Sequence, residues 1–260
     1  MIGCDCRVCM SDDTRNHRSR PSVMVSYGEH NDGNRPHRLL IDTTPELRLQ
    51  MTRHRIDRID GVLYTHSHAD HVFGLDDLRR FNAVMEQPLD VYAEPPVIDW
   101  LKQTFTYVFE PSRNVNKSFI PNLIAQPLEP GASVDMFGAT WTPLRLLHGR
   151  LPILGFRVDL DGASLAYCTD VSSFPPETYP LISDLDVLVI DALRFRHHPT
   201  HLTVDQALEV IDQVKPKQAY LTHIAHEIEH AEVDTQLPDG VNLAFDSLCV
   251  DVSDLAARVG

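Results

Sequence analysis

The stretch Thr65-His66-Ser67-His68-Ala69-Asp70-His71 follows an apolar run at residues 61–64 and places three imidazoles and one carboxylate in a short turn. Zinc and manganese accept imidazole nitrogen and carboxylate oxygen, and the end of a strand can direct several such ligands at one point. His66 and His68 fall on the same side of an extended backbone, whereas Asp70 and His71 follow a bend and can serve a second ion. The chain holds 14 histidines, so some clustering arises by chance. Four ligand-type residues in such a short stretch nevertheless favour a metal site.

The composition is that of a soluble globular protein. The 260 residues, 43% hydrophobic and 23% charged, contain no linker that would split them, so we expect a single domain over residues 1–260. No apolar run approaches the roughly 20 residues that cross a bilayer, and the first residues do not form a signal peptide. The five cysteines are an odd number, which argues against a disulfide scaffold and for reduced thiols in the cytoplasm.

The charge limits the choice of substrate. A formal net charge of -14 repels polyanions, which argues against a large RNA or DNA substrate. A small phosphorylated metabolite remains compatible, because bound cations set the field at a metal site. The sequence leaves the oligomeric state open, although a homodimer would be one way to cover an unpaired sheet edge.

Three cysteines near the start form a second metal signal. Cys4, Cys6 and Cys9 have a C-x-C-x-x-C spacing, one ligand short of a tetrahedral zinc site. The segment Leu221-Thr222-His223-Ile224-Ala225-His226 supplies two candidates for the fourth ligand. We expect His226 to close a structural zinc site and His223 to join the catalytic metals; the alternative is three free thiols on a frayed terminus.

The remaining pattern predicts an α/β protein with two packed sheets and helices outside. Apolar stretches predict strands at residues 22–27, 38–42, 61–64, 89–93, 140–147, 155–160, 163–168, 185–190 and 218–221. Helices are expected at residues 44–54, 95–105 and 203–214, the last with Thr203 as its cap. Ligand-type residues directly follow several of these strands, namely His148, Asp170, Asp191 and His223. Strand ends of this kind bring distant residues to one rim.

The order His66 to His71, His148, Asp170 and His223 resembles the metallo-β-lactamase superfamily over nearly the whole chain. The resemblance implies a four-layer αββα sandwich with a dinuclear site at one edge of its sheets. One metal would take His66, His68 and His148, the other would take Asp70, His71 and His223, and Asp170 would bridge them.

Within the superfamily, the cysteines and the segment at residues 221–226 resemble the cyclic ribose phosphate phosphodiesterases of the carbon-phosphorus lyase pathway. That branch uses such cysteines and a late histidine for a structural zinc. The segments Asp191-Ala192-Leu193-Arg194 and Pro199-Thr200-His201-Leu202-Thr203 resemble it too, and His201 lies where the branch has an active-site histidine. This group usually has a strand and a Gly/Ser-rich turn before the first cysteine, so we expect that the usual first strand is missing. Either the start codon lies upstream, or a sheet edge is unpaired.

The chemistry expected of such a site is phosphodiester hydrolysis. Two ions about 3.5–4 Å apart can share a water, lower its pKa and present a bridging hydroxide in line with phosphorus. Asp70, as an ion-holding carboxylate, and His201 are the candidate catalytic residues. His201 would protonate the leaving alkoxide or bind the phosphate, since an imidazole can be cationic near neutral pH. The alternative for His201 is a solvated residue at the start of a helix. His197 and His198 are weaker candidates that read as surface residues, and Arg194 could hold phosphate or equally form a salt bridge.

Other functions remain open. A lactonase or thioesterase, or a tRNA-processing endonuclease of the same superfamily, would share the metal ligands. The endonucleases resemble proteins with a basic arm that this sequence lacks, and superfamily lactonases commonly place a tyrosine in the region of residues 191–201. A non-catalytic cofactor-biosynthesis binding protein would be expected to have an eroded dinuclear site. The ligands do not choose between manganese and zinc.

Overall fold

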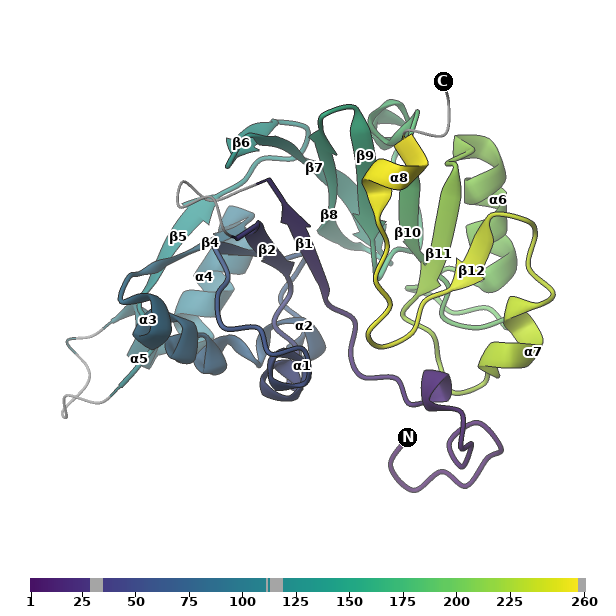
Figure 1. The fold of residues 1–260 in the computed structure, drawn as a ribbon, viewed down its shortest axis with the longest axis horizontal. Helices are drawn as coiled ribbons and strands as arrows, with labels where there is room; N and C mark the ends of the chain where they lie inside the picture. Colours follow the sequence, from purple (N-terminus) through teal and green to yellow (C-terminus); the bar gives the residue numbers. More distant parts are fainter. Residues whose placement is uncertain (29–34, 111, 113–118, 257–260) are drawn as a thin grey trace. The chain divides into compact units, whose positions relative to one another are not determined.

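The structure is a computed structural model that describes residues 1–28, 35–110, 112 and 119–256. The chain divides into two compact units. Unit 1 comprises Met1–Ser19 with Pro130–Gly260, and unit 2 comprises Arg20–Glu129. Each unit is built around a sheet with helices (Figure 1), which confirms the expected α/β class. The expectations of a single domain and of a missing first strand stay predictions.

Unit 2 contains a five-stranded sheet in the order β1-β2-β3-β4-β5. Its strands are β1 (Val23–Tyr27), β2 (His37–Ile41), β3 (Gly61–Leu63), β4 (Leu89–Ala93) and β5 (Leu123–Pro127). Strand β1 runs antiparallel to β2, and the other neighbouring pairs are parallel. The carboxyl ends of β2 and β3 therefore lie side by side, with Ile41 paired to Leu63. The residues that follow these two strands can meet at one sheet edge.

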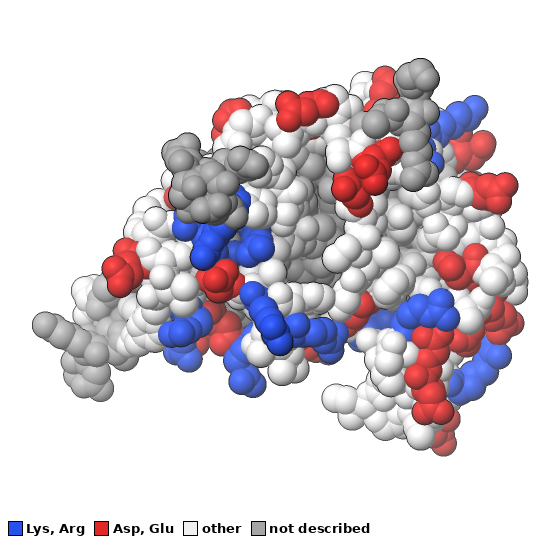
Figure 2. Space-filling view, in the orientation of Figure 1, with Lys and Arg blue, Asp and Glu red and all other residues white. Residues whose placement is uncertain are grey.

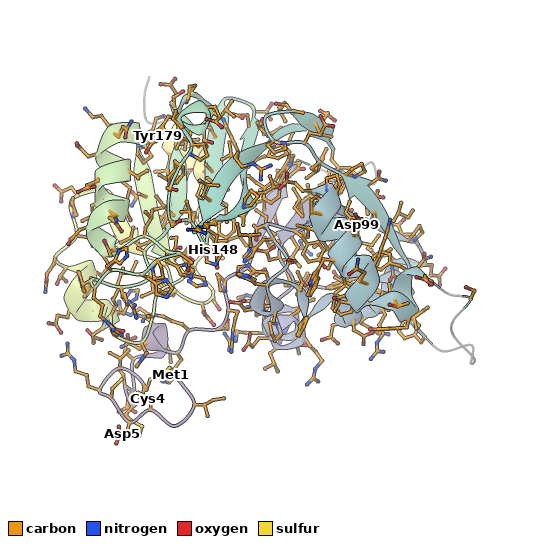
Figure 3. All side chains as sticks on the ribbon, turned by 180° about the vertical axis from the view of Figure 1, so that it is seen from behind. Met1, Cys4, Asp5, Asp99, His148 and Tyr179 are labelled. Atoms are coloured by element: carbon orange, nitrogen blue, oxygen red, sulfur yellow. The ribbon has the colours of Figure 1, made fainter. Side chains whose placement is uncertain are left out.

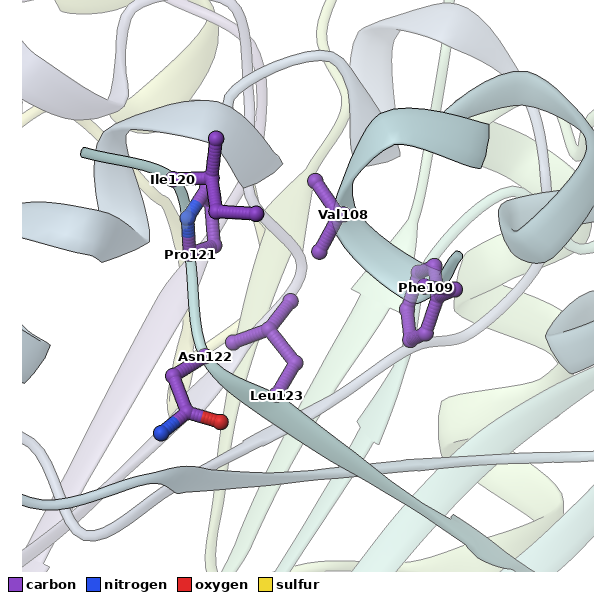
Figure 4. Close-up of a pocket in the computed structure, with 6 residues that line it drawn as sticks. All are labelled: Val108, Phe109, Ile120, Pro121, Asn122 and Leu123. Carbon is purple, nitrogen blue, oxygen red and sulfur yellow. The ribbon is translucent and has the colours of Figure 1, made fainter. Parts of the chain in front are cut away.

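The helices of unit 2 pack their apolar sides on this sheet. They are α1 (Leu47–Arg53), α2 (Ala69–Val72), α3 (Arg79–Met85), α4 (Pro95–Thr104) and α5 (Thr106–Phe109), with a 3-10 turn η2 (Leu75–Leu78). Leu47, Phe81, Ile98 and Val108 join the buried strand residues in one apolar cluster. Between α5 and β5 lies a pocket of about 280 Å³ lined by Val108, Phe109, Ile120, Pro121, Asn122 and Leu123 (Figure 4). Its lining has no titratable side chain, so it offers no hydrolytic chemistry.

Unit 1 contains a seven-stranded sheet in the order β12-β11-β10-β9-β8-β7-β6. Its strands are β6 (Val134–Met136), β7 (Ala139–His148), β8 (Leu151–Leu160), β9 (Ala163–Cys168), β10 (Val187–Asp191), β11 (Gln218–Thr222) and β12 (Val241–Leu243). Strands β6 to β9 pair antiparallel, whereas β9 to β12 pair parallel. The carboxyl ends of β9, β10 and β11 therefore meet at one edge, the place expected for Asp170, Asp191 and His223.

Helix α6 (Val204–Val214) is the longest helix of unit 1 and packs its apolar side on β10 and β11. Thr203 caps it as expected: its hydroxyl accepts the Gln206 backbone N–H at 3.2 Å. In turn, the side-chain oxygen of Gln206 accepts a hydrogen bond from the Thr203 backbone N–H at 3.0 Å. This capping box fixes where the helix begins and thus where the preceding loop ends. The other helices are η1 (Thr14–Asn16), η4 (Pro176–Ile182), α7 (His230–Asp234) and α8 (Val252–Ala256).

Among the described residues, no helix has the length and apolar character needed to span a bilayer. Most of the negative excess of the sequence lies in unit 1. Lys and Arg side chains lie among Asp and Glu on both units in the face that Figure 2 shows.

Candidate metal centres

In unit 2, the histidine stretch leaves the end of β3 and turns into the short helix α2. The Thr65 backbone N–H donates to Asp42 Oδ1 at 2.9 Å, and the Thr65 hydroxyl donates to Asp42 Oδ2 at 2.8 Å. These bonds tie the start of the stretch to the residue that follows β2. His68 precedes α2 in an extended conformation, and Asp70 lies in the first turn. The bend predicted between His68 and Asp70 is therefore present.

The three imidazoles of this stretch pack against one another. The His66 ring lies with its centroid 4.5 Å from that of His68 and 4.3 Å from that of His71. His71 Nε2 lies 3.7 Å from Asp70 Oδ2. Two ligands of one zinc ion with bonds of about 2.0–2.1 Å lie about 3.4 Å apart in a tetrahedral arrangement. The four predicted ligands of unit 2 are thus gathered, and their donor atoms suit zinc or manganese.

Asp42, which the sequence did not indicate as a site residue, contacts the predicted ligand His71. It is fully buried, and its Oδ2 accepts a hydrogen bond from His71 Nδ1 at 2.7 Å. Burial raises the pKa of Asp42, while the neighbouring His71 opposes that shift. Because a carboxylate can only accept, His71 carries its proton on Nδ1, and Nε2 is the nitrogen that could bind a metal ion. The sequence signal was an aspartate directly after the β2 strand, the same strand-end placement that marked the other candidates.

In unit 1, a tight hairpin positions His148. Strands β7 and β8 pair over their whole length, from Thr140 opposite Asp159 to His148 opposite Leu151. Only Gly149 and Arg150 form the turn, and Gly149 has the positive φ of 63° that such turns require. His148 is the last residue of β7 (Figure 3). Its Nδ1 donates to the Thr200 carbonyl at 2.8 Å, so Nε2 is the nitrogen that could bind a metal ion.

Asp170 and His223 each follow a strand of the parallel part of the sheet. Both have a positive φ, 56° in each case, which turns the chain sharply after the strand. His223 Nε2 lies 3.4 Å from Asp170 Oδ2, the spacing of two ligands around one ion. Asp170 is buried, and its other oxygen accepts the Thr169 hydroxyl at 2.8 Å. The structure thus brings together these two predicted ligands.

His201 lies in the same cluster of unit 1. Its ring stacks on His223 with centroids 4.6 Å apart and packs edge-on against His148, also at 4.6 Å. The ligand atoms of His148, Asp170 and His201 all lie within 4.8 Å of one another. Nδ1 of His201 donates to Oδ2 of the buried Asp191 at 2.7 Å. His201 is therefore held and buried, which excludes the alternative of a solvated residue at the helix start.

The cysteine motif and His226 meet within unit 1. The ligand atoms of Cys4, Cys6, Cys9 and His226 lie within 4.8 Å of one another. His226 Nδ1 is 3.5 Å from Cys4 Sγ and 3.4 Å from Cys6 Sγ. A sulfur and a nitrogen bound to one tetrahedral zinc, with bonds of about 2.3 and 2.0–2.1 Å, lie about 3.5 Å apart. The donor set and its spacing therefore fit zinc.

The N-terminal segment is docked on the strand β11 to helix α7 region by further contacts. Arg18 donates to the Ala225 carbonyl at 3.0 Å, Asn16 donates to Glu229 at 2.8 Å, and Arg7 pairs with Glu232. The Cys9 backbone N–H, followed by the His226 ring, lowers the pKa of Cys6 to about 6. A thiolate is the form that binds zinc. The three thiols are thus not carried on a frayed terminus.

The family can now be assigned. The model of the beta-lactamase superfamily domain matches residues 37–224, and this chain belongs to that family, the metallo-β-lactamase superfamily. A solved structure described as a new diphosphatase from the PhnP family is 38% identical, with a TM-score of 0.84 over 96% of this chain and 91% of that chain. The fold, the family and the gathered His and Asp ligands identify a metal-dependent hydrolase.

Two further proteins are similar to this chain. A curated relative named octanoyltransferase, from Porphyromonas gingivalis (strain ATCC BAA-308 / W83), is 34% identical over 99% of this chain and 50% of its own length. This chain therefore spans about half of that relative. Zinc-bound PqqB from Methylobacterium extorquens is 19% identical with a TM-score of 0.72 over 96% of this chain and 94% of that one. The second likeness concerns the fold alone.

Proposed function

We propose that the chain is a metal-dependent phosphodiesterase that hydrolyses a small phosphorylated metabolite, with cyclic ribose phosphates as the first candidates. The observation that carries the proposal is the cluster of His148, Asp170, His201 and His223, in which His201 is oriented by a buried carboxylate. The PhnP-family diphosphatase, 38% identical over 91% of its length, supports phosphate chemistry. The acidic charge argues against a nucleic acid substrate.

The proposed dinuclear site uses the ligands that the resemblance to the superfamily implies. One ion would take His66, His68 and His148, the other would take Asp70, His71 and His223, and Asp170 would bridge them. Two divalent ions bound there, zinc or manganese, would supply a nucleophile at neutral pH and neutralise charge on the phosphate oxygens. Asp42 would keep His71 in the ligating tautomer, and the Thr200 carbonyl would do the same for His148. Cys4, Cys6, Cys9 and His226 would hold a third ion, a structural zinc.

His201 is proposed as the proton donor to the leaving oxygen. Its Nδ1 proton is held by Asp191, so Nε2 is the atom through which a proton reaches the substrate. A second proton on Nε2 makes the ring cationic, and the carboxylate of Asp191 stabilises that form. The acid is needed only when the leaving group is a poor one.

The function is tested by hydrolysis of a chromogenic phosphodiester beside a chromogenic lactone and thioester. The protein is reconstituted with manganese or zinc, and His71→Ala serves as the metal-ligand control. We expect metal-dependent turnover of the diester, lost in His71→Ala. In His201→Ala, kcat for an alkyl diester should fall about 100-fold or more, and less for a nitrophenyl leaving group. Turnover of the lactone or thioester alone would refute the substrate class.

A thioesterase is the second candidate, and one observation favours it. The relative from Porphyromonas gingivalis that covers 99% of this chain is named octanoyltransferase, an activity on an acyl group. Because this chain matches only 50% of that protein, the name can describe the other half. An octanoyl thioester therefore belongs in the same assay, and its metal-dependent hydrolysis without diester turnover would favour this candidate.

A further inference from the structure

The loop between β10 and α6 is closed at its base, so the side chains it carries have defined positions. The Leu193 backbone N–H donates to the Leu202 carbonyl at 3.0 Å, and the Val204 N–H donates to the Arg194 carbonyl at 3.1 Å. Leu202 in turn donates to the Val171 carbonyl at 2.8 Å, close to Asp170. These bonds fix the loop relative to the metal-ligand cluster of unit 1.

Thr200 connects three parts of this cluster. Its carbonyl accepts His148 Nδ1 at 2.8 Å, while its backbone N–H donates to His198 Nδ1 at 3.4 Å. The Thr200 hydroxyl lies 3.2 Å from the same nitrogen of His198. The Thr200 methyl group packs so closely on Gly149 that a Cβ at position 149 would lie only 2.9 Å from it. Thr200 is therefore locked between the β7–β8 turn and two histidines.

The contact with Thr200 determines the tautomer of His198. A backbone N–H can only donate, so His198 Nδ1 is the acceptor, and the neutral ring carries its proton on Nε2. His201 has the opposite arrangement, because Asp191 holds a proton on its Nδ1. The two rings are 5.0 Å apart between centroids. His198 thus provides an N–H donor beside the proposed proton donor, although the sequence suggested a surface residue.

We propose that His198 binds a phosphate oxygen of the substrate through Nε2–H and that Thr200 is the residue that positions it. This inference rests on the proposed function. His198 is half-buried beside His201, whereas the neighbouring His197 is exposed. Arg194, the other candidate phosphate ligand of this loop, donates to the Arg196 and His197 carbonyls at 3.2 Å each and to Glu227 at 3.5 Å. The Arg194 guanidinium therefore stabilises the loop backbone. This leaves His198 as the candidate for the contact with phosphate.

The test compares His198→Ala with His198→Gln, whose amide keeps a donor near the Nε2 position, and with His197→Gln as the surface control. Full-length protein loaded with manganese is assayed with a chromogenic phosphodiester, and inorganic phosphate is used as a competing ligand. We expect His198→Ala to raise KM and the phosphate inhibition constant about 10- to 100-fold with kcat within about threefold. His198→Gln should recover most of the loss, and His197→Gln should match the wild type. An unchanged KM, or a fall confined to kcat, would overturn the binding role.

The positioning role of Thr200 has a readout that does not depend on turnover. Nitrogen-15 NMR of the histidine rings should show His198 as the Nε2–H tautomer in the wild type and in Thr200→Ser. Thr200→Val, which lacks the hydroxyl, should show a larger share of the other tautomer. A wild-type ring protonated on Nδ1 would overturn the proposal. If the wild type hydrolyses no diester, the proposed function fails, while phosphate binding in wild type and His198→Ala, followed by phosphorus NMR, still decides the role of His198.

Discussion

At the scale of single residues, buried carboxylates and one carbonyl fix the tautomers of three histidines of the proposed site. Asp42 holds His71, Asp191 holds His201, and the Thr200 carbonyl holds His148. In each case Nδ1 donates its proton, so Nε2 is the nitrogen of these three rings that would bind a metal ion or take up a second proton. Such outer partners commonly change metal affinity 10- to 100-fold when removed.

Asp42→Asn should therefore weaken metal binding without removing a ligand. The amide can donate to His71 Nδ1 and stabilise the wrong tautomer, so we expect about 10- to 100-fold weaker binding at the ion that uses His71. Competition with a chelator of known affinity measures the change. Asp99→Asn, at an exposed position of α4 (Figure 3), is the control and should bind metal as the wild type does. Equal affinity in both variants would contradict the role of Asp42.

The sequence could predict the ligands but not these partners. His66, His68, Asp70 and His71 stand together in the chain, so their chemistry is visible without a fold. Asp42 lies 29 residues before His71, and only the parallel pairing of β2 with β3 brings the two together. His198 is half-buried because of the closed loop around Thr200, which hydrogen bonds define and local composition does not.

At the scale of elements, strongly patterned segments were predicted best. The bounds of β4 and β9 agree with expectation, and α4 and α6 differ from it by one residue at most. The strands β5, β6 and β12 were missed: β6 and β12 have three residues each, too few to show alternation. Strand β8 begins at Leu151 and includes Pro152, a residue that argues against a strand on propensity alone. Pairing with the long neighbour β7 overrides that preference.

Gly74 follows the histidine stretch and helix α2, and the turn there has no room for a side chain. A Cβ there would lie 2.2 Å from the Thr44 carbonyl oxygen and 2.8 Å from Leu47 Cβ, and the oxygen belongs to backbone that cannot rotate away. Gly74→Ala should lower the free energy of unfolding by about 1–3 kcal/mol because the turn must shift. Denaturant unfolding measures this. Val84→Ala, exposed on α3, should stay within about 0.5 kcal/mol of the wild type. An equally small effect for Gly74→Ala would contradict the close packing.

At the scale of the whole molecule, the N-terminal segment belongs to unit 1 through its contacts with residues 225–232. The proposed zinc site of Cys4, Cys6, Cys9 and His226 would secure this association. Because His223 and His226 lie three residues apart, the same loop supplies a ligand to both proposed metal sites. Loss of the structural zinc should therefore disturb the catalytic cluster as well.

The zinc site should depend on pH through Cys6. The folded pKa of about 6 lies below the ordinary value of 9.0, so the thiolate stabilises the docked segment fully above pH 9, and this contribution is lost as pH falls through about 6. Protons also compete with zinc for the thiolates. Zinc release to a chromogenic chelator should rise steeply below about pH 6, and Cys249→Ser should give the same curve because Cys249 lies outside the cluster. Release that does not change between pH 5 and 7 would contradict this account.

The central claim is the proposed metal-dependent phosphodiesterase activity, which would need two divalent ions. Its most direct test is a titration of metal-free protein, with the structural zinc retained, by manganese while hydrolysis of a chromogenic phosphodiester is followed. We predict that activity appears with the second equivalent of manganese and that His71→Ala in unit 2 and His148→Ala in unit 1 each abolish it. Full activity after one equivalent, or in either variant, would contradict the claim.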